Sequence, residues 1–240
     1  MAKYSKVTVN VPDIKSAFVY GNGISYSDAS VKKANTEMIR RINSQYGNLF
    51  TEWGNVFEIP KGILIGFCAT ESGGKMMPPN RYEATGLMQV TPIAIYECAR
   101  KWNKEVSSEL PFDAESLINQ KVPTLLKSST TLSSVKSRLL NVLQNDANFN
   151  IMAGALVLRW LIERFSTFLT GGQLNKAMVA YNAGAYTRSL VTSGSKANKI
   201  PIDSTSLSQN ALVPAESRSY LVKMLGVDGF LSIIYKDKAI

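Results

Sequence analysis

A single acidic side chain, Glu71, ends an apolar run at residues 63–70. Two later segments read Gly-Leu-Met-Gln-Val-Thr-Pro at residues 86–92 and Ala-Tyr-Asn-Ala-Gly at residues 180–184. One acid accompanied by amide and hydroxyl groups suits the cleavage of a glycosidic bond, because the leaving oxygen needs a proton while neighbouring groups hold sugar hydroxyls. The pattern therefore predicts a carbohydrate-cleaving site.

The position of Glu71 favours a protonated carboxyl group. Residues 63–70 are predicted to be helical, so their apolar side chains would shield the carboxyl from water, and such burial raises a carboxyl pKa. A free glutamic acid has a pKa of about 4.3 and is almost fully ionised at neutral pH, where a general acid must still hold its proton. We therefore expect Glu71 to be the catalytic acid.

Three residues of the glycine-led segment suit contact with sugar. Gly86 permits close approach of the backbone, Met88 offers an adaptable apolar surface, and Gln89 carries both a donor and an acceptor. Tyr181 and Asn182 complete the predicted polar wall. Each motif alone is usually structural, but their ordered combination favours a binding site.

The composition limits the chemistry. The chain has 240 residues and no histidine, which excludes Ser-His and Cys-His nucleophiles and the usual zinc ligand sets. We expect neither a metal nor a cofactor. The two cysteines, Cys68 and Cys98, lie in apolar helical patterns and are expected to be buried free thiols.

A net charge of +9 indicates a polyanionic partner. The basic residues are scattered and are not interleaved with aromatic residues, so an acidic cell-wall polymer fits the charge better than nucleic acid does. No segment is long and apolar enough for a membrane span, and we expect no signal peptide because the first ten residues have neither an uninterrupted apolar region nor a small-residue cleavage site.

The fold is expected to be mainly α-helical, because apolar residues recur at helical spacing and no long alternating pattern competes. Residues 1–50 are predicted to form an N-terminal arm with one helix that ends before Gly47. Residues 51–240 are predicted to form the catalytic domain, in which Pro60 opens the helix that carries Glu71.

Further segments are assigned by the same periodicity and by turn residues. Helices are predicted at residues 93–102, 114–120, 151–165, 173–181 and 216–225. A short strand is predicted at residues 7–11, a loop at 128–134, and a flap over a cleft at 192–210.

Together these segments resemble the soluble lytic transglycosylase family, which has the fold of goose-type lysozyme and cleaves bacterial peptidoglycan. The resemblance covers roughly residues 57–235. It implies a lysozyme-like helical domain with a cleft, preceded by an N-terminal extension. The matching motifs, in the family's order, are Glu71-Ser72, residues 86–89 with Pro92, residues 150–156, residues 180–184 and residues 216–220.

The resemblance also implies a role for each matching residue, with Glu71 as the single acid/base. Glu71 would protonate the oxygen between N-acetylmuramic acid and N-acetylglucosamine, then accept the proton of the C6 hydroxyl as that oxygen closes onto C1. The product is a 1,6-anhydro sugar, and no second carboxylate is needed. The residues that would line the glycan groove are Ser72, Gly86, Met88, Gln89, Tyr181, Asn182, Ala183, Glu216 and Tyr220.

Three alternatives stay open. Glu83 could activate water and make the chain a hydrolytic muramidase, although a solvated loop glutamate is the commoner case. The domain could be a non-catalytic, peptidoglycan-binding structural module of a virion. It could also bind nucleic acid, an alternative that the positive charge alone supports. The loop at residues 73–82, the long stretch at 104–148 and the first fifty residues depart from the family pattern.

The expected context follows from the expectation that the chain carries no signal peptide. We expect synthesis in a host cytoplasm and action on the cell wall or periplasm, with delivery by a holin, a phage particle or a secretion machine. The arm at residues 1–50 would dock to virion or secretion-machine proteins. A bacteriophage lysis enzyme or a virion component is the preferred interpretation.

Overall fold

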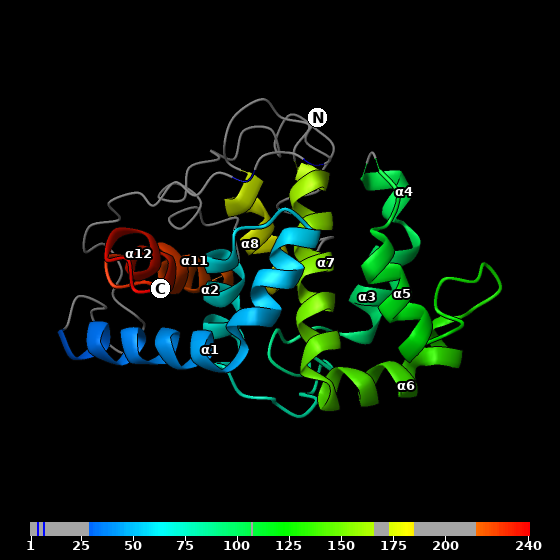
Figure 1. The fold of residues 1–240 in the computed structure, drawn as a ribbon, viewed down its shortest axis with the longest axis horizontal. Helices are drawn as coiled ribbons and strands as arrows, with labels where there is room; N and C mark the ends of the chain where they lie inside the picture. The colour runs from blue at the N-terminus through cyan, green and yellow to red at the C-terminus, as the bar shows by residue number, and fades with distance from the viewer. Residues whose placement is uncertain (1–3, 5–6, 8–28, 107, 166–172, 185–214) are drawn as a thin grey trace.

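A computed structural model shows a helical protein (Figure 1). The residues that it describes are 4, 7, 29–106, 108–165, 173–184 and 215–240. Within these residues, the only extended pairing is an isolated antiparallel bridge between Thr85 and Val90. The prediction of a mainly α-helical fold is confirmed, whereas the lysozyme-like cleft and the N-terminal extension remain predictions.

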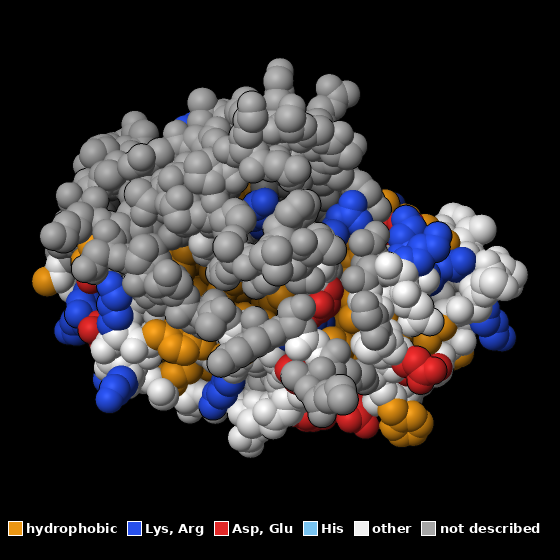
Figure 2. Space-filling view, turned by 90° about the horizontal axis from the view of Figure 1, so that it is seen from above, with side chains coloured by type: hydrophobic (Ala, Val, Ile, Leu, Met, Phe, Trp, Pro, Cys, Tyr) orange, Lys and Arg blue, Asp and Glu red, His pale blue; other side chains and the backbone are white. Residues whose placement is uncertain are grey.

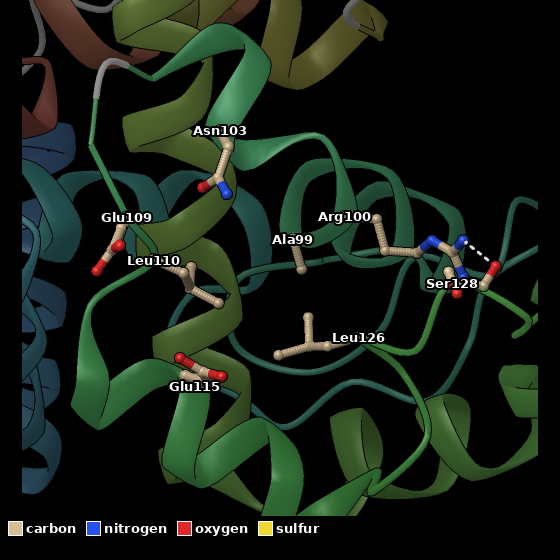
Figure 3. Close-up of a pocket in the computed structure, with 8 residues that line it drawn as sticks. All are labelled: Ala99, Arg100, Asn103, Glu109, Leu110, Glu115, Leu126 and Ser128. Atoms are coloured by element: carbon tan, nitrogen blue, oxygen red, sulfur yellow. Dashed lines mark hydrogen bonds between the residues drawn. The ribbon is translucent and has the colours of Figure 1, made fainter.

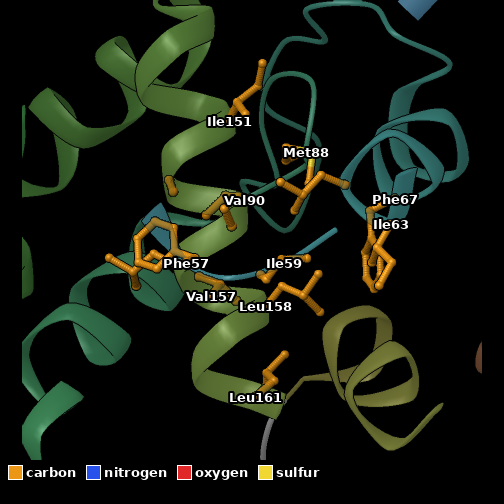
Figure 4. Close-up of a cluster of buried hydrophobic side chains, with 14 of the residues drawn as sticks. Phe57, Ile59, Ile63, Phe67, Met88, Val90, Ile151, Val157, Leu158 and Leu161 are labelled. Atoms are coloured by element: carbon orange, nitrogen blue, oxygen red, sulfur yellow. The ribbon is translucent and has the colours of Figure 1, made fainter. Parts of the chain in front are cut away.

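Helix α7 (Ala147–Phe165) is the central element (Figure 1). The helices that pack around it include α1 (Ala29–Val56), α3 (Pro92–Arg100), α6 (Leu132–Asn145) and α8 (Gln173–Ala183). Residues 149–162 of α7 are all buried, so the helix is enclosed on every side rather than along the single stripe that was predicted. Helix α2 (Lys61–Ser72) is also buried from Gly62 to Ala69. Figure 4 shows apolar side chains of α2 and α7 meeting in one cluster.

Helix α1 (Ala29–Val56) is longer than predicted. The prediction that it ends before Gly47 is wrong, because the helix continues and buries Phe50 and Trp53. The predicted division between residues 50 and 51 falls inside α1. Its buried side chains join the same core as those of α2 and α7.

The buried guanidinium of Arg159 fixes the turn that leads from α1 into α2. Its Nε donates to the Phe57 carbonyl oxygen at 2.8 Å, and its Nη2 donates to the Glu58 carbonyl oxygen at 2.6 Å. Its Nη1 also lies 2.9 Å from Glu163 Oε1. A buried charge is tolerated when it is paired and hydrogen-bonded in this way, so Arg159 sets where α2 begins.

The remaining helices agree with most of the predictions. Helices α3 (Pro92–Arg100) and α4 (Trp102–Glu105) divide the helix that was predicted at 93–102. Three other predicted helices are present with shifted ends: α5 (Phe112–Lys121), α8 (Gln173–Ala183) and α11 (Ala215–Leu225). Two helices were not predicted: α6 (Leu132–Asn145) and α12 (Phe230–Lys236). Residues 8–11 of the predicted strand and the whole predicted flap lie outside the described residues.

Cys68 and Cys98 are buried free thiols, as predicted. Figure 2 shows Lys and Arg side chains in separate groups on one face of the molecule, with acidic side chains between them. None of the helices in the described ranges is both long and apolar enough to span a membrane.

Candidate active site

Glu71 lies in the last turn of α2, where apolar residues precede it and a glycine ends the helix. Gly73 adopts the left-handed conformation with φ of 61°, and its N–H donates to the Ala69 carbonyl oxygen. Glu71 as a whole is half-buried, but its Oε1 is inaccessible to solvent. That oxygen has no hydrogen-bond partner among the described residues.

The surroundings of the Glu71 carboxyl favour its protonated form. Burial raises the pKa of Glu71 from 4.5 to about 7. The hydroxyl of Tyr220 and the charge of Lys223 lower the pKa in part, and the charge of Glu216 raises it further. This direction agrees with the expectation for a catalytic acid.

Two tyrosines flank the same region of α2. The ring of Phe67 lies 5.0 Å from the ring of Tyr181 on α8 and 6.1 Å from the ring of Tyr220 on α11, measured between centroids. Burial raises the pKa of both phenols well above 10, and the nearby charge of Glu71 adds to the shift. Residues far apart in the sequence therefore meet around the carboxyl.

The Tyr220 hydroxyl is buried beside Glu71 and has no well-formed hydrogen bond to any described residue. The two groups lie within electrostatic reach, but neither Glu71 Oε1 nor the Tyr220 oxygen satisfies the geometry of a hydrogen bond. Buried polar atoms without partners are uncommon because desolvation costs about 1–3 kcal/mol each. Two such atoms side by side identify a candidate catalytic site.

The loop at residues 86–89 is closed at its base by the bridge between Thr85 and Val90, whose two backbone hydrogen bonds measure 3.1 and 3.2 Å. Inside the loop, Gln89 adopts a positive φ of 47°. Its Nε2 donates to the Gly86 carbonyl oxygen at 2.9 Å. The predicted sugar-binding amide of Gln89 is thus half-buried and partly engaged by the loop itself.

Asn150, a fully buried residue of α7, holds this loop from below. Its Oδ1 accepts from the Met88 N–H at 2.8 Å, and its Nδ2 donates to the carbonyl oxygens of Thr85 and Leu143, both at 2.9 Å. Asn150 belonged to a matching motif but was not predicted as a site residue. An amide at the start of an otherwise apolar helix is the sequence pattern that could have indicated it.

Gly86 and Met88 have structural roles that differ from those predicted. Gly86 has φ of 78°, and a Cβ placed there would lie 2.1 Å from Asn150 Nδ2, so the close neighbour of its backbone is Asn150 rather than a sugar. Met88 is fully buried within the apolar cluster (Figure 4), and its side chain packs against Gly154 of α7. The expectation that the Met88 side chain contacts sugar is therefore wrong in this structure.

The Met88 backbone joins the loop to α8. The Tyr181 hydroxyl donates to the Met88 carbonyl oxygen at 2.8 Å. Ser72 joins the loop to α2, because its Oγ donates to the Leu87 carbonyl oxygen at 2.7 Å and accepts from the Gly74 N–H at 3.1 Å. These two hydroxyls hold the three elements together, although both residues were predicted to contact the glycan.

The remaining predicted groove residues lie on α8 and α11. Asn182 Oδ1 accepts from the hydroxyl of Ser217 at 2.7 Å, which fixes α8 against α11. Ala183 and Glu216 are exposed. Tyr220 is buried, so its hydroxyl lies beside the Glu71 carboxyl rather than on an open surface.

Glu83 does not join the Glu71 site. Its Oε1 lies 2.6 Å from Lys136 Nζ on α6, and its side chain is 39% exposed. This arrangement agrees with the interpretation of Glu83 as a solvated loop glutamate.

No protein-family model and no curated protein matches the chain. The family resemblance therefore depends on the motifs alone. Within the described ranges, no three His, Cys, Asp or Glu side chains are close enough together to hold a metal ion. The cleft over Glu71 remains a prediction, since residues 185–214 lie outside those ranges.

Proposed function

We propose that the chain is a peptidoglycan lytic transglycosylase in which Glu71 is the sole acid and base. The observation that carries the proposal is the Glu71 carboxyl, which has a pKa of about 7 and a buried oxygen without a partner in the described residues. With such a pKa, protonated and ionised forms are both populated near neutral pH. One side chain can then both give and take a proton.

The reaction uses both forms in turn. Protonated Glu71 gives its proton to the oxygen that joins C1 of N-acetylmuramic acid to C4 of N-acetylglucosamine, and the C1–O bond breaks. The resulting carboxylate takes the proton of the muramic acid C6 hydroxyl while O6 bonds to C1. The products are a 1,6-anhydro end and a free C4 hydroxyl, and Glu71 is again protonated. Because O6 is already tethered to the sugar, no positioned water is required.

The ion pair of Glu83 favours this reaction over hydrolysis. A hydrolytic mechanism with a second carboxylate needs that carboxylate beside the scissile bond, as a base for water or as a nucleophile. Glu83 is instead paired with Lys136 on α6. The proposed product is therefore the anhydro sugar rather than a reducing end.

The net charge of +9 suits an enzyme that works on an anionic wall. We place the protein in phage lysis or in wall penetration during entry, with peptidoglycan as its partner. Tyr4 of the N-terminal arm is buried, with its ring 6.2 Å from that of Trp102 and 5.1 Å from the Arg159 guanidinium. At least this residue of the arm packs on the helical core, so docking to virion or secretion-machine proteins would fall to other residues of the arm.

The decisive test is Glu71→Gln. The amide keeps the size of the side chain but cannot act as an acid, so we expect clearing of purified peptidoglycan to disappear while the far-UV circular dichroism is unchanged. Glu52→Gln, on the exposed surface of α1, is the matched control and should clear normally. Near wild-type clearing by Glu71→Gln would reject the assignment.

Mass spectrometry of the fragments released by the wild type then identifies the reaction. Anhydro ends support the lytic transglycosylase, whereas reducing ends identify a muramidase. Binding to peptidoglycan without release of any fragment would instead support a non-catalytic wall-binding module.

A further inference from the structure

A second concave site lies away from Glu71, on the side of α7 that faces α3 and α5. It is a surface pocket of about 540 Å³, formed by α3, α4, α5 and the segments that precede and follow α5 (Figure 3). A pocket of this size lies within the range of small-molecule sites. Neither the sequence motifs nor the proposed reaction uses it.

Two carboxylates and one amide provide its polar wall. Glu109 and Glu115 lie on either side of Leu110, and Asn103 projects from α4 above them (Figure 3). All three polar side chains are exposed, and no ion pair to Glu109 or Glu115 is found among the described residues. The pocket thus presents negative charge that no ion pair with the described residues neutralises.

Three apolar residues complete the lining beside these polar groups. Ala99 of α3 is buried, whereas Leu110 and Leu126 remain half-exposed. Their side chains lie between the carboxylates and the far side of the pocket (Figure 3). Open apolar surface beside unpaired carboxylates complements a ligand with a hydrocarbon stem and a positively charged end.

Arg100 also lines the pocket, but its guanidinium is occupied by backbone carbonyls. Its Nη2 donates to the Ser128 carbonyl oxygen at 3.0 Å (Figure 3). Its Nη1 donates to the Lys127 carbonyl oxygen at 3.0 Å and to the Thr130 carbonyl oxygen. The guanidinium lies 4.8 Å from the ring centre of Tyr96. Arg100 therefore shapes the wall at residues 127–130 rather than pairing with the two glutamates.

We infer that this pocket binds an alkylammonium group, and specifically the amine-bearing side chain of the diamino acid in a peptidoglycan stem peptide. The ammonium would pair with Glu109 or Glu115 at the edge of the pocket, the Asn103 amide oxygen can accept a further hydrogen bond, and the methylene stem would cover Leu110 and Leu126. The choice of source rests on the proposed function. A wall-cutting enzyme meets many stem peptides around each glycan strand, so a second contact would hold it on the polymer between cleavage events.

The test measures binding of the full-length protein to insoluble peptidoglycan whose stem peptides carry free amines. Glu71→Gln is used as the background so that the polymer stays intact. Adding Glu109→Gln and Glu115→Gln should weaken binding about fivefold, the effect of losing two exposed charge pairs. Acetylating the amines of the peptidoglycan should weaken binding of the background protein by a similar factor and leave the triple variant unaffected.

The matched control adds Glu37→Gln and Glu52→Gln, two exposed residues of α1, to the same background. Both pairs of substitutions remove two negative charges from a protein of net charge +9. Non-specific attraction to the anionic wall would make both variants bind more tightly. If only the pocket variant binds more weakly, the change in affinity is opposite to the one that the altered net charge would cause. That result supports the proposal.

Unchanged or tighter binding of the pocket variant would overturn the proposal, as would binding that does not depend on free amines. The second outcome would leave the amine of a protein partner as the alternative source. Cleavage of peptide-free glycan strands distinguishes failure of the pocket proposal from failure of the proposed function. The variant with only the Glu109 and Glu115 substitutions should cleave such strands at the wild-type rate, whereas failure of the wild type to cleave them would reject the proposed function.

Discussion

The Tyr181 hydroxyl donates a 2.8 Å hydrogen bond to the Met88 carbonyl oxygen and so joins α8 to the loop at residues 86–89. The same loop is held by Ser72 at the end of α2 and by Asn150 on α7. Three helices therefore set the position of one loop next to Glu71. The loop therefore depends on motifs from distant parts of the sequence. Several residues of these motifs that are predicted to contact sugar form hydrogen bonds within the protein instead.

Replacing Glu71 by glutamine should change how stability depends on pH. The native pKa is about 7 and the ordinary value is 4.5, so the native state holds more protons than the unfolded state between these pH values. The free energy of unfolding of the wild type therefore falls as pH rises through that interval. The total loss reaches about 3 kcal/mol once the pH is above the native pKa. Urea denaturation at several pH values should show that Glu71→Gln removes this fall.

At pH 4 the two proteins should be nearly equally stable, because Glu71 is protonated in both the native and the unfolded states. At pH 8 the variant should be the more stable one. Glu37→Gln, on the exposed surface of α1, is the control and should leave the pH dependence as it is in the wild type. A Glu71→Gln protein less stable than the wild type at pH 8 would contradict the burial of an acid at this position.

Tyr220→Phe should shift the pH–activity profile without lowering stability at acidic pH. The Tyr220 hydroxyl forms no well-formed hydrogen bond with the described residues, so at pH 4, where Glu71 is protonated, its removal should raise the free energy of unfolding by up to about 1 kcal/mol. The same hydroxyl lowers the pKa of Glu71. Its loss should therefore raise that pKa and move the alkaline limb of the activity profile to higher pH.

Tyr96→Phe provides the contrast, because the Tyr96 hydroxyl donates to the Thr130 carbonyl oxygen at 2.9 Å. That variant should lose about 1 kcal/mol of stability and keep the wild-type pH profile. An alkaline limb that does not move in Tyr220→Phe would exclude Tyr220 as a group that tunes the acid.

Most helices could be predicted from the sequence because apolar periodicity and flanking turn residues agree in them, as they do in α2 and α11. Helix α1 shows where this fails. Gly47 indicates a helix end, yet the core contacts of Phe50 and Trp53 outweigh the poor helix propensity of glycine. A Cβ at Gly47 would lie 2.7 Å from Asn43 Oδ1, so glycine there allows close packing within the helix.

Helix α6 was missed because its start is rich in hydroxyl residues, which are typical of loops. The same residues cap the helix: Thr131 Oγ1 accepts from the Ser134 N–H at 3.4 Å. Hydroxyl residues favour helix starts and loops alike, so the local pattern did not distinguish the two. The apolar positions of α6, Val135, Leu139 and Leu143, recur at helical spacing and would have indicated it.

The candidate acid could be predicted because its burial follows from neighbours in the sequence. The role of Asn150 could not, because its partners Thr85 and Met88 lie more than sixty positions away. Met88 was misjudged for a related reason. An apolar side chain beside a polar site can face either the ligand or the core, and its contact with Gly154 decides in favour of the core.

Asn150→Ala should destabilise the protein and displace the loop. The substitution removes the partner of two buried backbone groups, the Met88 N–H and the Leu143 carbonyl oxygen, and leaves the Thr85 carbonyl oxygen with the Val90 N–H alone. At about 1–3 kcal/mol for each of the two groups that lose their partner, we expect a loss of at least about 2 kcal/mol in the free energy of unfolding. Activity measured well below the melting temperature should also fall, because the loop beside Glu71 moves.

The control for this prediction is Asn145→Ala. Asn145 Nδ2 donates to the Asn141 carbonyl oxygen at 2.9 Å in an exposed position, so its loss should cost less than about 1 kcal/mol. Chemical denaturation of both variants gives the comparison. Equal, small losses would show that Asn150 does not support the loop.

Gly86→Ala and Gly184→Ala form a pair that separates backbone strain from steric clash. Both glycines have positive φ, 78° and 91°, so either alanine incurs the strain of a left-handed conformation, about 1–2 kcal/mol. A Cβ at Gly184 meets nothing within 4 Å, whereas a Cβ at Gly86 would lie 2.1 Å from Asn150 Nδ2. Gly86→Ala must therefore also push Asn150 away and break the hydrogen bonds that hold the loop. We expect Gly184→Ala to lose about 1–2 kcal/mol, and Gly86→Ala to lose at least twice as much together with most of the activity. Equal losses in thermal or urea unfolding would mean that the contact between Gly86 and Asn150 is not what holds the loop beside Glu71.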